Sequence, residues 1–295
     1  MSEVFLATLQ QSQSQLKHYL ESELDAIAVN SVSLLAAMRH GLLLGGKRIR
    51  PHLIYSVGAL TQTQSKLLNP VAAAIESIHA YSLIHDDLPA MDDDNLRRGQ
   101  PTCHIAFDEA SAILAGDALQ SFAFEQLCTV DLPAAKNLDL IRCLSQAAGY
   151  RGMCGGQALD IEATDQHVTI EQLQAIHSAK TGALISAAVE MGAITAGIDN
   201  IEHRKALHQY GQSIGLAFQV QDDILDITSD TQTLGKPQGS DTDANKATYP
   251  ALLGLENAKL KAQQLHQKAL QALDELPYDC ENLRSLADYV VNRTH

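Results

Sequence analysis

Two clusters of aspartates are the residues in this chain whose types and spacing are best suited to chemistry. The stretch 86–94 contains five aspartates, and the stretch 222–226 contains three. Like charges at this spacing repel one another, so such clusters add nothing to the stability of a fold on their own. The pattern is explained if cations lie among the carboxylates. We therefore predict that the two clusters face each other across one cavity and hold divalent metal ions.

The second cluster has the simpler geometry. Asp222 and Asp226 are four residues apart and therefore share one face of a helix, and Gln219 lies along the same side. The flanking residues are mostly apolar, and carboxylates on an apolar helix are costly unless they are paired or bound to metal. A solvated acidic edge would explain one such motif alone. Two motifs, each on an apolar helix, favour metal binding.

The ligand types indicate which metal the clusters would bind. Ligands that are all oxygen favour Mg²⁺ or Ca²⁺ over zinc, and no twelve-residue calcium loop with a central glycine is present. Mg²⁺ takes one or two carboxylates and completes its shell with water and substrate phosphate. The clusters therefore predict a phosphorylated ligand between them.

Basic residues near the clusters support an anionic ligand. Lys47 and Arg50 follow the pair Gly45–Gly46, where a helix start would bind an anion, although a solvated basic turn could have the same sequence. Arg97 and Arg98 follow the first cluster directly. The chain has no Walker motif and no dinucleotide-binding glycine motif, so nucleotide binding has no support.

Composition limits the class of protein. The chain has 295 residues, of which 45% are hydrophobic, and a formal net charge of -14. This acidic balance argues against nucleic acid or an anionic membrane as the main partner. The five cysteines form no Cys-x-x-Cys pair, which is typical of reduced thiols in a cytoplasmic protein. The stretch 1–20 lacks a signal-peptide pattern, and the apolar segment 182–197 is short for a membrane span and carries Glu190.

The elements that must position these residues are predicted to be helices of a single all-α domain spanning 1–295. No linker or repeat divides the chain, and glycine and proline are sparse. An apolar central helix is predicted for 71–87, entered at Pro70. Pro89 interrupts the helical backbone, which allows Asp92 to return toward Asp86.

Three further stretches complete this prediction. A capping box at 169–172 starts a helix that runs to Ala196, and a helix at 203–227 carries the second cluster. The irregular stretch 230–248 is long enough to be functional. Small residues at 72–74 and 183–188 are expected to line an apolar cavity between the helices. A polar mouth over such a cavity would suit a diphosphate with a hydrocarbon tail.

Along nearly its whole length the chain resembles the trans-isoprenyl diphosphate synthases. The matching stretches are GGKRIRP (45–51), HAYSLIHDDLPAMDDDNLRRGQPTCH (79–104), GGQALDIE (155–162), KTGALI (180–185), FQVQDDILD (218–226) and LGKPQGSDTDANKATYP (234–250). Within the family, the motifs are most similar to those of the bacterial synthases that make farnesyl diphosphate. The resemblance implies an all-α bundle of about ten core helices around a central cavity, usually in a homodimer.

The implied reaction is the Mg²⁺-dependent head-to-tail condensation of isopentenyl diphosphate with an allylic diphosphate, here dimethylallyl or geranyl diphosphate. Carried over by motif position, three Mg²⁺ ions would be held by Asp86, Asp92 and Asp222, supported by Asp87 and Asp226. Isopentenyl diphosphate would be bound by Gly46, Lys47, Arg50, His79 and Arg98. The allylic diphosphate would be bound by Arg97, Lys180, Lys236 and Lys246, with Thr181 and Gln219 facing the allylic carbon. In this scheme the residues that act in catalysis are Arg97, Lys180, Thr181 and Gln219, and Asp93 and Asp94 have no assigned role.

The resemblance also bears on the length of the product. In this family, a bulky residue five positions before the first aspartate stops chain growth, and here that residue is Tyr81, which implies a fifteen-carbon product. A geranylgeranyl diphosphate synthase, with a smaller residue there, is the first alternative. A class I terpene cyclase is a remoter one, since it should lack the GGKRIRP stretch. A non-catalytic acidic scaffold or calcium buffer leaves the basic cluster and the cavity unexplained.

Overall fold

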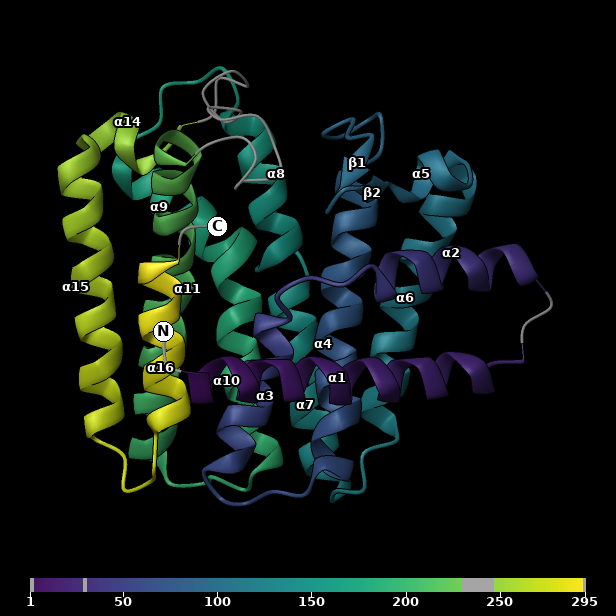
Figure 1. The fold of residues 1–295 in the computed structure, drawn as a ribbon, viewed down its shortest axis with the longest axis horizontal. Coiled ribbons are helices and arrows are strands. Elements are labelled where there is room, and N and C mark those ends of the chain that lie inside the picture. The colour runs from purple at the N-terminus through teal and green to yellow at the C-terminus, as the bar shows by residue number, and fades with distance from the viewer. Residues whose placement is uncertain (1–2, 29–30, 230–246, 294–295) are drawn as a thin grey trace.

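The chain folds into helices that mostly run side by side, as a computed structural model shows for residues 3–28, 31–229 and 247–293 (Figure 1). The helices are α1 (Glu3–Ala26), α2 (Val32–Leu43), α3 (Ile49–Ala59), α4 (Ser65–Asp86), α5 (Cys103–Ala106), α6 (Glu109–Cys128), α7 (Ala134–Ala148), α8 (Met153–Ala163), α9 (Ile170–His177), α10 (Ala183–Thr195), α11 (Ile201–Thr228), α14 (Tyr249–Leu253), α15 (Leu255–Asp274) and α16 (Glu281–Asn292). The predicted all-α bundle of about ten core helices is confirmed. Within the described residues, a hairpin of two short antiparallel strands, β1 (Leu96–Arg97) and β2 (Gln100–Pro101), follows the first aspartate cluster.

Helix α4 forms the centre of the bundle, as its apolar sequence predicted. It packs against α6, α3, α10, α2 and α1, and most of its residues from Leu68 to Ile78 are fully buried. Its length and composition would also suit a membrane span, but 67% of its most apolar window is buried inside the protein. The helix begins at Ser65 and not, as predicted, at Pro70. Pro70 has no backbone N–H to donate, but buried Leu68 extends the apolar face by a further turn.

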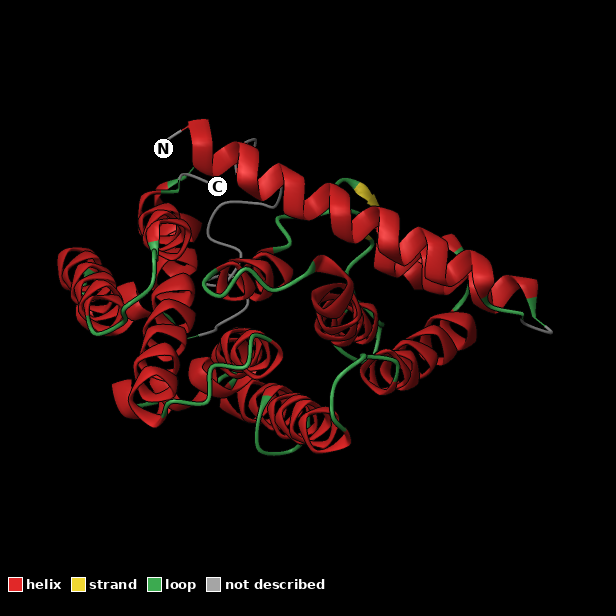
Figure 2. Ribbon diagram, turned by 90° about the horizontal axis from the view of Figure 1, so that it is seen from below, coloured by secondary structure: helices red, strands yellow, loops and turns green. Residues whose placement is uncertain are grey.

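The arrangement of helices brings the two aspartate clusters to one end of the bundle. Figure 1 shows α4 and α11 ending at the upper end, where β1, β2 and α14 also lie. Helix α1 crosses one face of the bundle at a steep angle, which Figure 2 shows from below. Its leucines at helical spacing, Leu9, Leu16, Leu20 and Leu24, are buried against the bundle. The candidate site residues therefore lie at one end of a helical bundle that α1 packs across.

The predicted helix from 169 to 196 is correct in extent but not in regularity. The capping box is present: the Thr169 hydroxyl accepts from Gln172 N, and the Gln172 side chain accepts from Thr169 N at 2.7 Å. However, α9 and α10 are joined by a π-helix, η1 (Ser178–Gly182), instead of a continuous α-helix. π-turns of this kind occur mostly inside α-helices and often at functional sites.

Two glycines on neighbouring helices allow η1 to be packed this closely. A Cβ on Gly156 of α8 would overlap the backbone nitrogen of Lys180. A Cβ on Gly215 of α11 would lie only 2.9 Å from the Cα of Gly182. The π-turn is thus held between two backbones that approach without side chains, which fixes the direction of Lys180 and Thr181.

Candidate active site

The first aspartate cluster turns back on itself after α4, as Pro89 led us to expect. The backbone nitrogen of Asp92 donates to the carbonyl oxygen of Asp86 at 2.8 Å, and that of Asp93 donates to the Leu88 carbonyl at 3.2 Å. Burial raises the pKa of the Asp86 carboxyl to about 6; the charge of Lys180 opposes this shift, and that of Asp92 adds to it. The ionised carboxylates are therefore under-compensated within the protein.

Asp87 has a partner of its own. Its buried carboxylate accepts from the Nε of Arg97 at 2.7 Å and 2.9 Å, and also from the terminal nitrogen of the same guanidinium. This two-pronged pair fixes Arg97 on β1, opposite Gln100 of β2. The structure therefore gives Asp87 the task of orienting Arg97. Its predicted support of a metal stays a prediction.

The glycine pair before α3 holds an arginine in place. Gly45 and Gly46 have positive φ values of 91° and 113°, and a Cβ on Gly46 would overlap the guanidinium of Arg98. Arg98 donates to the carbonyl oxygen of Gly45. Arg48, in contrast, turns inward to form a buried ion pair with Glu76 of α4, so it stabilises the start of α3 and is not exposed to a ligand.

The remaining basic residues form a crowded, half-buried group. Arg50 and His79 line the same cavity, and the Nε of Arg50 is buried with no hydrogen-bond partner among the described residues. Burial lowers the pKa of Arg50 and of Lys47. Burial, followed by the charges of Arg50 and Arg98, lowers the pKa of His79 well below 6.5, so this ring is neutral at pH 7. Such a group is stabilised by binding an anion.

The second aspartate cluster lies on α11, with each carboxylate in a different environment. Asp222 accepts from Arg293 at 2.6 Å, whereas Asp226 is 1% exposed. Gln219 meets the π-turn: the Thr181 hydroxyl donates to its Oε1 at 3.0 Å. Thr181 and Gln219 are therefore brought together as the resemblance implied. Asp222 also lies close enough to Lys47 and Arg50 for its charge to oppose part of the lowering of their pKa by burial, which connects this cluster to the basic group.

Sequence reasoning missed two residues of the site, Asp160 and Arg293. Lys180 donates to Asp160 of α8 at 2.6 Å, and Arg293 follows α16 near the C-terminus. Asp160 belongs to the GGQALDIE stretch, so that motif was the available signal. No motif marks Arg293. The predicted ligands Lys236 and Lys246 lie outside the described residues.

A cavity of 350 Å³ connects several of these side chains. Six of the predicted or nearby polar residues line it: Arg50, His79, Tyr81, Asp86, Lys180 and Thr181. Its apolar wall comes from α8, with Met153, Ala158 and Ile161. The expected wall of small residues was wrong: 72–74 are core residues, and Ala183 faces elsewhere, because η1 turns the start of α10 away from the cavity.

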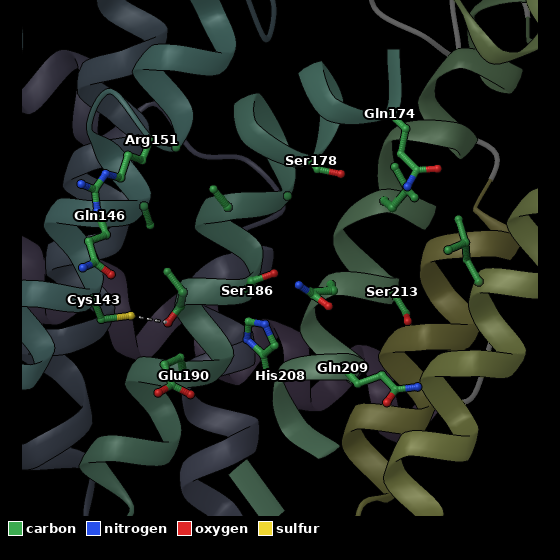
Figure 3. Close-up of a pocket in the computed structure, with 18 of the residues that line it drawn as sticks. Cys143, Gln146, Arg151, Gln174, Ser178, Ser186, Glu190, His208, Gln209 and Ser213 are labelled. Atoms are coloured by element: carbon green, nitrogen blue, oxygen red, sulfur yellow. Dashed lines mark hydrogen bonds between the residues drawn. The ribbon is translucent and has the colours of Figure 1, made fainter. Parts of the chain in front are cut away.

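A larger groove of 980 Å³ lies against the other side of η1 (Figure 3). Gly182 is one of its lining residues, as are Ser178, Ser186, Cys143, Gln174 and His208, which Figure 3 labels. None of the predicted site residues lines it. The size of this groove therefore does not identify the site, and the smaller cavity, where charged groups converge, is the better candidate.

The donor set of the smaller cavity fits Mg²⁺. Asp86 lines the cavity and, like Asp92, whose backbone nitrogen donates to the Asp86 carbonyl, supplies oxygen ligands only. Burial raises the pKa of Asp86, and the charge of Asp92 adds to this shift, so a cation would stabilise the ionised form. Among the described residues, no three His, Cys, Asp or Glu side chains converge to form a complete metal site. Mg²⁺ bound here would therefore share its shell between aspartates, water and the oxygens of a bound diphosphate.

Comparison with known proteins agrees with this geometry. The family model described as polyprenyl synthetase matches residues 32–285. The chain belongs to the polyprenyl synthetase family. It is 52% identical to the farnesyl diphosphate synthase of Haemophilus influenzae over 291 residues, covering 98% of each chain. It is 54% identical to the farnesyl diphosphate synthase of Escherichia coli over 266 residues, covering 88% of this chain and 89% of the relative.

The solved structure of a related protein with bound ligands is similar in fold. The geranyltransferase of Helicobacter pylori, complexed with magnesium and isoprenyl diphosphate, has a TM-score of 0.82 and 37% identity to this chain. The match covers 97% of this chain and 96% of that one. The polyprenyl synthetase fold of this chain therefore extends over nearly all its residues.

Proposed function

We propose that this chain is a Mg²⁺-dependent prenyltransferase that condenses isopentenyl diphosphate with dimethylallyl diphosphate and then with geranyl diphosphate, giving (2E,6E)-farnesyl diphosphate. The observation that carries the proposal is one cavity lined both by the charged residues Asp86, Arg50 and Lys180 and by apolar residues of α8. This profile suits a diphosphate with a hydrocarbon tail. The two relatives named as farnesyl diphosphate synthases support the product.

Different charged residues of the site would bind each of the two diphosphate groups. Arg97 and Lys180 bind the allylic diphosphate, and the basic group of Lys47, Arg50 and Arg98 binds that of isopentenyl diphosphate. The Nε of Arg50, which has no hydrogen-bond partner in the described part of the chain, supplies a donor for it. His79 can contribute a neutral N–H donor beside these cations. Asp86, Asp92 and Asp222 would hold Mg²⁺, which would supply positive charge to the leaving diphosphate.

The reaction then proceeds without a dedicated base on the protein. The C1–O bond of the allylic substrate breaks and the electron pair leaves with the diphosphate. The oxygens of Thr181 and Gln219, 3.0 Å apart, stabilise the developing allylic cation through their dipoles. The double bond of isopentenyl diphosphate attacks C1 of the allylic substrate. The released diphosphate then takes the proton that leaves C2 of the isopentenyl unit. The apolar wall of α8 keeps water from the cation.

The proposal includes the surroundings of the site. We place the chain in the cytoplasm as a single domain, which the five free cysteines support. The exposed side chains of Ile113 and Leu114 on α6 support a homodimer. Light scattering coupled to size exclusion should give twice the monomer mass of 31.9 kDa, and a monomer mass would contradict the dimer.

The direct test is incubation of the purified protein with Mg²⁺, isopentenyl diphosphate and dimethylallyl diphosphate, followed by identification of the product. A fifteen-carbon diphosphate is expected, and chelation by EDTA should abolish its formation reversibly. A twenty-carbon product would replace the proposal with a geranylgeranyl diphosphate synthase. Absence of any condensation would overturn it.

Two variants of one cluster sharpen this test. Asp86→Asn should reduce kcat at least 100-fold, which corresponds to about 2.7 kcal/mol. Asp93→Asn is the matched control, because Asp93 has no assigned role and its left-handed φ of 53° suits asparagine. It should change kcat less than threefold. Equal losses in both variants would show that overall cluster charge, and not Asp86 itself, matters.

A further inference from the structure

Asp223 is a buried carboxylate on α11 that the proposed mechanism leaves without a role. Its side chain is 2% exposed. The neighbouring Asp222, in contrast, accepts a hydrogen bond from Arg293. The Oδ1 of Asp223 accepts from the Nε2 of Gln219 at 3.0 Å. Its Oδ2 accepts from the backbone nitrogen of Tyr249, the first residue of α14, at 2.9 Å. Both oxygens are thus used as acceptors inside the protein.

The chemistry of an amide makes this contact directional. The Gln219 side chain has one oxygen and one NH₂ group, which could exchange places by a rotation of about 180°. An ionised carboxylate only accepts hydrogen bonds, so it holds the NH₂ of Gln219 toward itself. The oxygen must then point the opposite way, toward the Thr181 hydroxyl at 3.0 Å. A rotated amide would place two acceptors against each other at Asp223.

We propose that Asp223 is a positioning residue that fixes the orientation of the Gln219 amide, so that its oxygen and not its NH₂ group faces the reacting allylic carbon. This inference rests on the proposed function. The difference matters because an oxygen dipole stabilises a developing cation, whereas an N–H dipole in the same place destabilises it. The bond to Tyr249 N holds the carboxylate itself in place, so the orientation is fixed from α14 through α11 to η1.

The test exchanges the two polar groups. Asp223→Asn keeps the shape of the side chain and can still accept from Tyr249 N through its oxygen. Its NH₂ group, however, now faces Gln219, which must rotate its oxygen toward Asn and its NH₂ group toward Thr181. The double variant Gln219→Glu/Asp223→Asn restores the original pattern. The new amide donates to the new carboxylate, whose other oxygen again faces Thr181, and the net charge is unchanged.

Steady-state kinetics and thermal unfolding are measured for the wild type, D223N, Q219E/D223N and a control. We expect D223N to lower kcat at least tenfold, with KM for isopentenyl diphosphate changed less than twofold and Tm changed by only a few degrees. We expect the double variant to recover most of the lost kcat. The control is Glu202→Gln, which also converts a carboxylate to an amide but at an exposed position of α11, and it should match the wild type.

The outcomes separate a positioning role from a structural one. D223N with kcat within threefold of the wild type overturns the proposal. So does a double variant that is no more active than D223N, or that fails to fold, because both hydrogen bonds are restored in it. If the wild type itself makes no prenyl product, the proposed function fails. An active wild type with an unaffected D223N overturns only the role of Asp223.

Discussion

Arg293 donates from Nη2 to the Oδ1 of Asp222 at 2.6 Å and joins the end of the chain to the second aspartate cluster. The same guanidinium donates to the carbonyl oxygen of Phe218 at 2.9 Å and lies over the Phe218 ring, with its Cζ 4.0 Å from the ring centroid. The Arg293 side chain is 2% exposed, while that of Asp222 is 41% exposed. One buried cation therefore fixes three features of α11 from outside that helix.

Removal of Arg293 should destabilise the protein. Breaking a fully buried pair costs about 3–5 kcal/mol, and the partial exposure of Asp222 reduces this figure. We therefore expect Arg293→Ala to lower the free energy of unfolding by about 1–3 kcal/mol, measured by urea denaturation. Arg142→Ala, which breaks an exposed pair with Asp139, is the control and should cost about 0.5 kcal/mol or less. Equal effects would contradict the bracing role of Arg293.

Tyr81 should limit the length of the product. Its ring lines the cavity that also contains Asp86, and it packs edge-on against His85 with the ring centroids 5.3 Å apart. Tyr81→Ala removes the ring from the cavity, so the main product should lengthen from fifteen to twenty or more carbons, as chromatography of the dephosphorylated products would report. Tyr150→Ala, at a position 79% exposed, should leave the length unchanged. A fifteen-carbon product from Tyr81→Ala would rule out this stop.

The close packing of α8 on η1 predicts opposite outcomes for two neighbouring glycines. Gly156→Ala would place a methyl group 2.6 Å from the Cα of Lys180, where only backbone movement can relieve the overlap. We expect it to lower stability by about 1–3 kcal/mol and to reduce kcat at least tenfold. Gly182→Ala meets its nearest atom at 3.6 Å, an ordinary contact, and should be tolerated. Thermal melts and assays of both variants check this contrast.

Stability should fall in mild acid because of a buried histidine. Burial lowers the pKa of His52 from 6.5 to about 4, and Ser12 lies 3.0 Å from its Nδ1. The folded state therefore resists protonation that the unfolded state accepts. This contribution is complete above pH 6.5 and is lost as the pH falls toward 4, by up to about 3 kcal/mol.

Urea denaturation between pH 7 and pH 4 would measure this slope. His52→Gln should flatten it, but only in part, because burial also lowers the pKa of His177 to about 4. His177→Gln should remove a further part. If the His52 variant kept the full slope of the wild type, the assignment to His52 would be wrong.

Local patterns in the sequence predicted the helices and the acidic and basic motifs, because helical spacing and Pro89 act within a few residues. The return of Asp92 to Asp86 and the meeting of Thr181 with Gln219 follow from such patterns and from the family resemblance. Partners distant in sequence were not predictable in this way. Arg293 reaches Asp222 across 71 positions, with no motif to mark it.

The π-turn shows the same limit. Its residues read as ordinary helix, and the close packing around η1 depends on Gly156 and Gly215, which come from two other helices. The wall of the cavity was mispredicted for a related cause. Small residues at 183–188 suggested a lining, but the π-turn rotates them away from it, and α8 takes their place.

The π-turn also makes the register of this region sensitive to a single deletion. Each residue of an α-helix turns the chain by about 100°, so loss of one residue from Ser178–Gly182 would let α9 and α10 join as one regular helix. In that regular helix, Lys180 and Thr181 would be rotated out of the cavity and onto the side of the larger groove. The extra residue thus acts as a spacer that keeps two catalytic candidates on one cavity while their neighbours Ser178 and Gly182 line the larger groove.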